Sequence, residues 1–130
     1  MQIPSHLKYT EEHEWLRVED DNIAYIGITD FAQGELGELV YVEVDTVGET
    51  IEKNEVFGTV EAVKTTADLY MPVSGTILEF NPAIDEAEGD EPTMVNESPY
   101  EKGWIIKIKV LDPSELDDLM DAAAYQELVG

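Results

Sequence analysis

Two groups of residues in this 130-residue chain have types and spacing that could do chemistry. The first is His13, which stands among Glu11, Glu12 and Glu14. An imidazole with neighbouring carboxylates can bind a metal ion. A single imidazole is a weak metal signal, however, and a solvated acidic turn accounts for the same residues. We therefore expect no metal site here.

The second candidate is Lys64, one of six lysines, which lies in the otherwise apolar and β-branched stretch of residues 60–69. On a helix, Glu61 and Asp68 would share a face with Lys64 and form an ion-pair cluster. The β-branched residues of the stretch favour a strand instead. On a strand, Lys64 is either an ordinary solvated lysine or a residue with a special role.

Other catalytic signatures are missing from the sequence. The chain has no cysteine, which excludes disulfides, thiolate metal sites and thiol catalysis. Its glycines form neither a dinucleotide-binding fingerprint nor a phosphate-binding loop with a following lysine. Carboxylates are so abundant that no pair stands out as a general acid and base. We therefore expect that the protein is not an enzyme.

The charge of the chain narrows its possible partners. Thirty Asp and Glu residues stand against seven Lys and Arg residues, which gives a formal net charge of -23. Nucleic acid phosphates and anionic membrane surfaces repel such a chain, so we expect neither as a partner. The acid excess indicates either a basic partner or life in concentrated salt, and its spread along the chain favours salt.

Several features bear on location. No segment is apolar enough to span a membrane, and residues 1–7 lack the charged-then-apolar pattern of a signal peptide. Together with the absence of cysteine, these features lead us to expect a cytoplasmic protein.

The elements that position these residues begin with a hairpin and a short helix. Residues 15–19 alternate in type, residues 22–28 are short and apolar, and acidic turn residues lie between them. Thr29 can cap a helix that runs to Leu36 and ends at Gly37.

The rest of the chain predicts strands and one terminal helix. A strand over residues 39–44 would place Val40, Val42 and Val44 on one face. Residues 85–91 are acidic and rich in turn formers, which predicts a surface loop. Further strands are expected over residues 56–63, 69–71, 76–80 and 104–110.

The C-terminal segment changes to helical periodicity. Asp112 is a cap residue, Pro113 stands at the first helical position and Glu115 lies three residues after the cap. Apolar residues at helical spacing follow. We expect a C-terminal helix over about residues 113–128.

These motifs, in this order, resemble the glycine cleavage system H-protein family. The likeness is closest at residues 58–64 and 68–75, which resemble the lipoyl-attachment region of the family. The resemblance implies one carrier domain over residues 1–130. Its fold would be mainly β, a flattened lipoyl-type β-sandwich or barrel (a barrel-sandwich hybrid) with short helices and a C-terminal helix. Further matches occur at residues 7–10, 13–15, 27–33, 40–43, 98–100, 103–104, 106–108 and 121–125.

The resemblance also implies a lipoate cofactor in amide linkage to Lys64, at the tip of a hairpin. No Asn-Gly-type turn signal predicts this hairpin from the local sequence. Gly48 and Gly75 resemble the glycines that flank the modified lysine in lipoyl domains, where a turn needs positive φ or the backbones approach closely.

The implied function is carriage of the aminomethyl group of glycine. A pyridoxal-phosphate glycine decarboxylase would load the cofactor and a tetrahydrofolate-dependent aminomethyltransferase would unload it. A dihydrolipoyl dehydrogenase that uses FAD would then take the electrons. A lipoate ligase or transferase would attach the cofactor, which does the chemistry while the protein supplies attachment and orientation.

Three acids gain implied roles from the same resemblance. Glu14 and Asp68 fall where the family could hold the loaded arm in a surface cleft, by charge-assisted contact with a protonated amine. Glu61 falls where the modifying ligase could make contact. Glu14 and Asp68 could each instead be an ordinary solvated surface acid.

Alternative carriers are distinguished by the neighbours of the lysine. Biotinyl domains place Met on both sides of it, where this chain has Val63 and Thr65. Lipoyl domains of 2-oxo acid dehydrogenases have Asp before the lysine and lack the C-terminal helix. An H-like relay protein, which passes its lipoyl group to other enzymes, needs the same lysine as a cleavage-system carrier. An unmodified interaction domain would tolerate replacement of Lys64 without loss of function.

Overall fold

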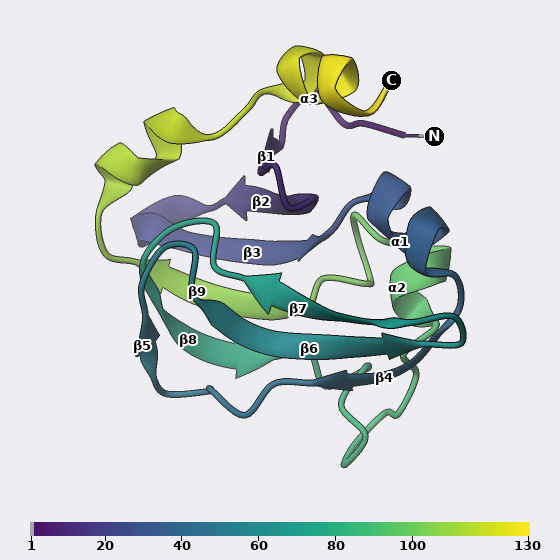
Figure 1. Ribbon diagram of the computed structural model, residues 1–130. Helices are drawn as coiled ribbons and strands as arrows, with labels where there is room; N and C mark the ends of the chain where they lie inside the picture. The colour runs from purple at the N-terminus through teal and green to yellow at the C-terminus, as the bar shows by residue number, and fades with distance from the viewer. Residues whose placement is uncertain (1) are drawn as a thin grey trace.

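The computed structural model describes residues 2–130, which form nine strands in two sheets together with a few short helices (Figure 1). The strands are β1 (Lys8–Tyr9), β2 (Glu14–Val18), β3 (Ile23–Ile28), β4 (Leu39–Glu43), β5 (Thr50–Ile51), β6 (Val56–Ala62), β7 (Thr66–Tyr70), β8 (Gly75–Phe80) and β9 (Ile106–Val110). The helices are α1 (Asp30–Leu36), α2 (Met94–Glu97), α3 (Ala122–Val129) and the 3-10 helices η1 (Asp20–Asn22) and η2 (Pro113–Asp118). None of the helices in this part of the chain is long and apolar enough to cross a membrane.

The two sheets are antiparallel. One has the strand order β1-β2-β3-β9-β8-β5 and the other has the order β4-β6-β7. Apolar side chains from both sheets share the larger of two core clusters, which includes Leu16, Ile26, Val60, Leu69 and Ile77. The expected fold class, mainly β with short helices, is confirmed.

The predicted N-terminal hairpin and helix are also confirmed. β2 pairs with β3 from Glu14↔Ile28 to Val18↔Ala24. The hydroxyl oxygen of Thr29 accepts the Ala32 N–H at 3.2 Å at the start of α1. These signals are local, so the sequence alone is sufficient to place both elements.

The predicted face of β4 is wrong. Val40 is 46% exposed, whereas Leu39 and Val42 are both buried. The register with β6 shifts between Leu39 and Tyr41, as in a β-bulge. A bulge sets two residues against one on the partner strand, so the simple alternation of Val40 with Val42 is broken.

The C-terminal segment is not one helix over residues 113–128. The 3-10 helix η2 ends at Asp118, and the chain then runs extended through Met120 before α3 begins. Met120 forms an isolated bridge with Tyr9, with both N–H···O distances at 2.9 Å. Asp121 caps α3 by accepting the Ala124 N–H at 2.9 Å. A second cap residue and a long-range bridge therefore divide the segment.

The two glycines that were expected to allow turns or close approach do so. Gly48 has φ of +91°, in the left-handed region that favours glycine. A Cβ atom on Gly75 would lie 2.8 Å from the main-chain oxygen of Lys109, because β8 and β9 pass closely there.

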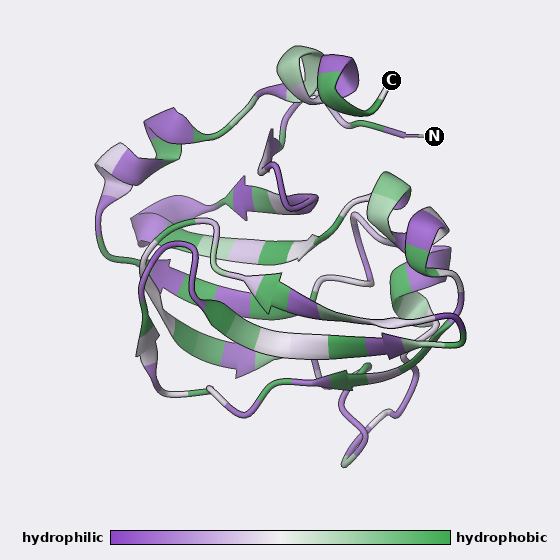
Figure 2. Cartoon of the chain, in the orientation of Figure 1, coloured by the Kyte–Doolittle hydropathy of each residue, from purple (hydrophilic) through white to green (hydrophobic). Residues whose placement is uncertain are grey.

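The acidic stretch of residues 85–91 lies in turns at the surface, and Figure 2 shows the loop that follows β8 as largely hydrophilic. Its neighbour Ile84 is fully buried and anchors this loop to the core.

Candidate functional site

β6 and β7 form a hairpin, which Figure 1 shows. Lys64 lies exposed in the turn between these two strands. The Ala62 N–H donates to the Thr65 carbonyl at 2.8 Å and closes the turn. The Val63 N–H donates to the Glu38 carbonyl at 3.0 Å, which pins the tip to the segment after α1. The hairpin that the resemblance implied is present, and hydrogen bonds hold the backbone of the residues on either side of the lysine.

The Lys64 side chain has few restraints. A Cβ atom on Gly37 would lie 3.5 Å from both Cδ and Cε of Lys64, so the stem of the side chain passes the end of α1. The two ion pairs in residues 2–130, Arg17–Glu19 and Lys53–Asp118, do not include it. The ion-pair cluster on a helix is therefore wrong for Lys64, because the segment is strand, turn and strand.

Glu61 and Asp68 lie together on the solvent face of the three-stranded sheet. Glu61 pairs with Thr66 and Asp68 pairs with Thr59 across β6 and β7. Both acids line an open hollow of about 420 Å³ that also includes Glu43 of β4. The hollow lies beside the hairpin that carries Lys64 and is strongly acidic.

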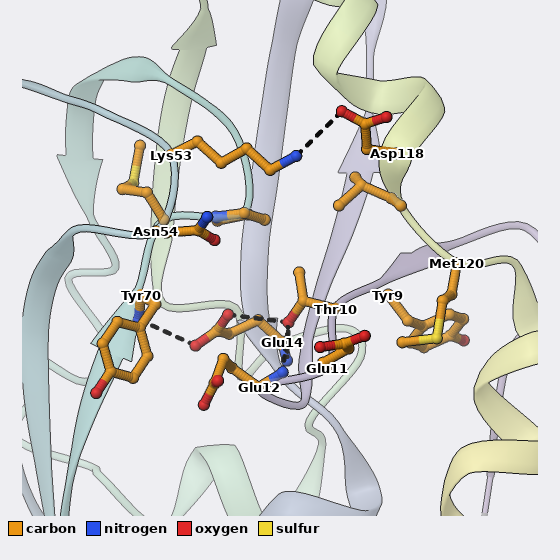
Figure 3. Close-up of a pocket in the computed structure, with 13 residues that line it drawn as sticks. Tyr9, Thr10, Glu11, Glu12, Glu14, Lys53, Asn54, Tyr70, Asp118 and Met120 are labelled. Carbon is orange, nitrogen blue, oxygen red and sulfur yellow. Dashed lines mark hydrogen bonds and ion pairs between the residues drawn. The ribbon is translucent and has the colours of Figure 1, made fainter.

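Glu14 lies elsewhere, buried in a cleft of about 270 Å³ between the N-terminal turn, the end of β7 and the segment after η2 (Figure 3). Its side chain is only 2% exposed. One carboxylate oxygen accepts the Thr10 hydroxyl at 3.0 Å and the other accepts the Tyr70 N–H at 3.0 Å. Lys53 and Asp118, paired at 3.2 Å, also line the cleft.

The environment of Glu14 disfavours its charged form. Burial raises the pKa of Glu14 to about 8, and the negative charge of Glu12 adds to this effect. The bonds from the Tyr70 N–H and the Thr10 hydroxyl lower the pKa but do not offset burial. A cation in the cleft would reverse the balance, because an opposite charge favours the carboxylate.

Lys64 lies just before the start of β7, and Glu14 of β2 binds Tyr70 at the other end of that strand. The chain from Lys64 to Tyr70 spans six residues, or roughly 20 Å in a strand. Asp68 lies between them, in the acidic hollow and not in the cleft. The sequence-predicted residues therefore form a line along β7, with Glu61 beside the tip on β6.

His13 is bound to protein groups. Its Nδ1 lies 2.8 Å from the Tyr125 hydroxyl, which is also 2.7 Å from the Thr29 hydroxyl. Burial lowers the pKa of His13 and outweighs the opposite effect of Glu12 and Glu35. Within residues 2–130, no group of three or more His, Asp or Glu side chains could hold a metal ion.

Sequence reasoning missed the contribution of Thr10, Lys53, Tyr70 and Asp118 to the cleft. The Thr10 hydroxyl accepts the N–H groups of Glu12 and Glu14, a local turn pattern that the sequence could have indicated. The others come from distant segments, and no local signal joins them to Glu14.

Comparison with known proteins gives one consistent family. The model of the glycine cleavage H-protein family matches residues 7–130. A glycine cleavage system H protein of Bacteroides thetaiotaomicron is 54% identical over 129 residues, which cover 99% of this chain and 98% of that protein. One from Chlorobium phaeovibrioides is 54% identical over 131 residues, which cover 100% of this chain and 99% of the relative. The crystal structure of a glycine cleavage system H protein from Mycobacterium marinum superposes with a TM-score of 0.82 at 34% identity, covering 96% of this chain and 97% of the other.

Proposed function

The chain belongs to the glycine cleavage H-protein family, and we propose that Lys64 is the residue through which it carries lipoate. The protein is a carrier and not an enzyme. It shuttles the aminomethyl group of glycine from glycine decarboxylase to aminomethyltransferase, and electrons to dihydrolipoyl dehydrogenase. The lipoyl group, when attached, supplies the disulfide chemistry, and the protein supplies attachment and orientation.

The observation that carries this assignment is the placement of Lys64. The lysine is exposed at a hairpin tip whose backbone is held by the Ala62–Thr65 and Val63–Glu38 hydrogen bonds. A modifying enzyme, a lipoate ligase or transferase, can therefore reach the ammonium group. A rigid tip also keeps the flexible arm within reach of each partner, which raises its effective concentration there.

Glu61 is proposed as a contact for the modifying enzyme. Its side chain lies on the exposed sheet face next to the hairpin tip, with Glu43 and Asp68 in the same hollow. A basic surface on the enzyme would complement these acids and orient Lys64.

Glu14 and Asp68 are proposed as contacts for the loaded arm. Asp68 lies on β7 between the attachment point and the cleft, and Glu14 lies in the cleft at the far end. A protonated amine that entered the cleft would favour the ionised form of Glu14 and make a charge-assisted contact there. Burial in the cleft would also exclude water from the labile group.

We further propose that residues 1–130 act as one carrier domain and that the protein works in the cytoplasm. The family model covers almost all of this range, and the partners named above are metabolic enzymes. Cell fractionation followed by detection of the protein tests the location, and recovery in a membrane or secreted fraction would contradict it.

The deciding experiment is intact-mass measurement of the protein from its native host, with peptide mapping of the Lys64 region. We expect one lipoyl increment, located on Lys64. Lys64→Arg should abolish the increment, whereas Lys53→Arg, which keeps a cation beside Asp118, should retain it. A biotinyl increment, or no modification in a host with working lipoylation, would overturn the assignment.

A further inference from the structure

Thr10 occupies the centre of the turn that leads to Glu14. Its hydroxyl oxygen accepts the Glu12 N–H at 3.2 Å and the Glu14 N–H at 3.1 Å. Its main-chain N–H donates to the Glu14 carbonyl at 3.0 Å, and its carbonyl accepts the His13 N–H at 3.1 Å. The turn is therefore built around one threonine side chain (Figure 3).

These bonds fix the direction of the Thr10 hydroxyl. A hydroxyl group has one hydrogen and two acceptor lone pairs. Both lone pairs of Thr10 receive main-chain N–H groups, so the hydrogen is directed to the remaining partner, the Glu14 carboxylate oxygen at 3.0 Å. Thr10 therefore donates to Glu14 and has no lone pair left with which to accept a proton from it.

Glu14 consequently receives two fixed donors, one on each oxygen. The Tyr70 N–H is the second, and as a main-chain amide it can only donate. A carboxylate has about four lone-pair sites, so roughly two remain for further donors. In its ionised form such a group, lining the cleft, makes charge-assisted bonds with an ammonium ion. A thiol is only a weak donor to it, and an uncharged disulfide ring has no donor at all.

We propose that Thr10 is the positioning residue that holds the Glu14 carboxylate as an acceptor facing the cleft, so that the cleft holds the arm more tightly when the arm bears a protonated amine. This inference rests on the proposed role of Glu14 as an arm contact. The other titratable groups that line the cleft are Tyr9, Glu11, Glu12, Lys53, Tyr70 and Asp118, and all of them are unchanged in the variants below.

The first test uses the protein without any cofactor, so it does not depend on carriage. In a Lys64→Arg background, carbon NMR of the Glu14 carboxyl is followed as a function of pH. Thr10→Val should raise the Glu14 pKa further, by roughly one unit, because a hydrogen bond to the charged form is lost. The NMR chemical shift of the Tyr70 amide should also stop changing with pH in step with the Glu14 carboxyl. Thr10→Ser keeps the hydroxyl and should restore both signals.

Thr46→Val is the matched control. The Thr46 hydroxyl donates to the Phe57 carbonyl at 2.7 Å, and Thr46 does not line the cleft. This variant should lose stability as Thr10→Val does but leave the Glu14 titration unchanged. Equal Glu14 pKa values in Thr10→Val and the parent protein, or failure of Thr10→Ser to restore the parent value, would overturn the inference.

The second test separates this inference from the proposed function. Lipoylated protein is loaded with glycine and glycine decarboxylase, and spontaneous loss of the aminomethyl group is timed by intact mass. Thr10→Val and Glu14→Gln should each speed the loss, by up to roughly tenfold. If Glu14→Gln has no effect, the arm contact fails and the amine selection proposed for Thr10 falls with it. If Glu14→Gln speeds the loss and Thr10→Val does not, the arm contact stands and only the Thr10 inference is overturned.

Discussion

Glu14 makes the stability of this protein depend on pH in a direction unusual for an acid. Its pKa is raised to about 8 in the folded state, above its ordinary value of 4.5, because the carboxyl is buried. Between these two values the folded protein holds a proton that the unfolded chain has released. The contribution of Glu14 to stability is therefore greatest below pH 4.5 and is lost as the pH rises towards 8 and above.

Glu14→Gln should remove this dependence, because an amide does not titrate. We expect the free energy of unfolding of the parent protein to fall, relative to the variant, by on the order of 3 kcal/mol between about pH 5 and pH 8.5. Urea denaturation of both proteins across this range measures the difference. A constant difference would show that the Glu14 pKa is close to its ordinary value.

Lys64 should matter for function and not for folding. Its side chain is exposed and takes part in neither of the ion pairs in residues 2–130. Lys64→Ala should change the free energy of unfolding by no more than about 0.5 kcal/mol, as is typical of surface substitutions. Leu69→Ala, at a buried position of the same hairpin, is the comparison and should cost about 2–5 kcal/mol. A large loss of stability in Lys64→Ala would show instead that the lysine is structural.

At the scale of elements, the cleft depends on how α3 is attached. Tyr125 of α3 is fully buried, stacks on Tyr9 at 4.7 Å and binds His13 and Thr29 through its hydroxyl. The segment just before α3 supplies Asp118, Leu119 and Met120 to the cleft. Loss of the Tyr125 hydroxyl should therefore loosen one wall of the Glu14 site.

Tyr125→Phe should lower stability by about 1–3 kcal/mol, because the half-buried His13 ring and the buried Thr29 hydroxyl both lose their bond to the Tyr125 hydroxyl. The Tyr9 and Met120 amides, which bond to each other's carbonyls, should exchange faster with deuterium. Tyr41→Phe is the control, since the Tyr41 hydroxyl donates only to Glu43 near the surface. Unchanged exchange at Tyr9 and Met120 in Tyr125→Phe would mean that stacking alone holds α3.

The elements that the sequence predicted correctly are those with signals inside a few residues. Thr29 and Gly37 bound α1, and acidic turn residues join β2 to β3. The β4 bulge and the break before α3 were missed because each depends on a distant partner, the Leu39–Ala62 pairing and the Tyr9–Met120 bridge. Residue propensities and hydrophobic periodicity describe a local stretch of sequence, so they cannot indicate pairing with a distant segment.

The candidate site also has features that could be expected from the sequence and features that could not. The position of Lys64 at a hairpin tip came from resemblance, since no turn signal marks it, and the structure has that hairpin. The bond between Glu14 and Tyr70 joins residues 56 positions apart, so no local pattern could place the two together. Only the three-dimensional structure shows that Glu14 and Asp68 line two different hollows.

At the scale of the whole molecule, repulsion among acids is the dominant electrostatic feature. Thirty acids face seven basic residues, and residues 2–130 contain only two ion pairs. The basic residues are too few to neutralise the surface, and a large net charge destabilises a compact state by self-repulsion. Screening by salt should relieve that repulsion, because the Debye length falls from about 10 Å at 0.1 M to about 3 Å at 1 M.

The melting temperature should therefore rise between dilute and concentrated salt, which scanning calorimetry in potassium chloride can measure. A variant in which Glu86, Glu88 and Glu91 of the exposed loop become Gln should show a smaller rise, because it has less charge to screen. Sucrose is the solvent control, since it favours burial by exclusion without screening charge and should stabilise both proteins equally. Equal melting temperatures of the parent protein in dilute and concentrated salt would contradict the prediction. The acid excess would then favour the other interpretation, a surface that binds basic partners.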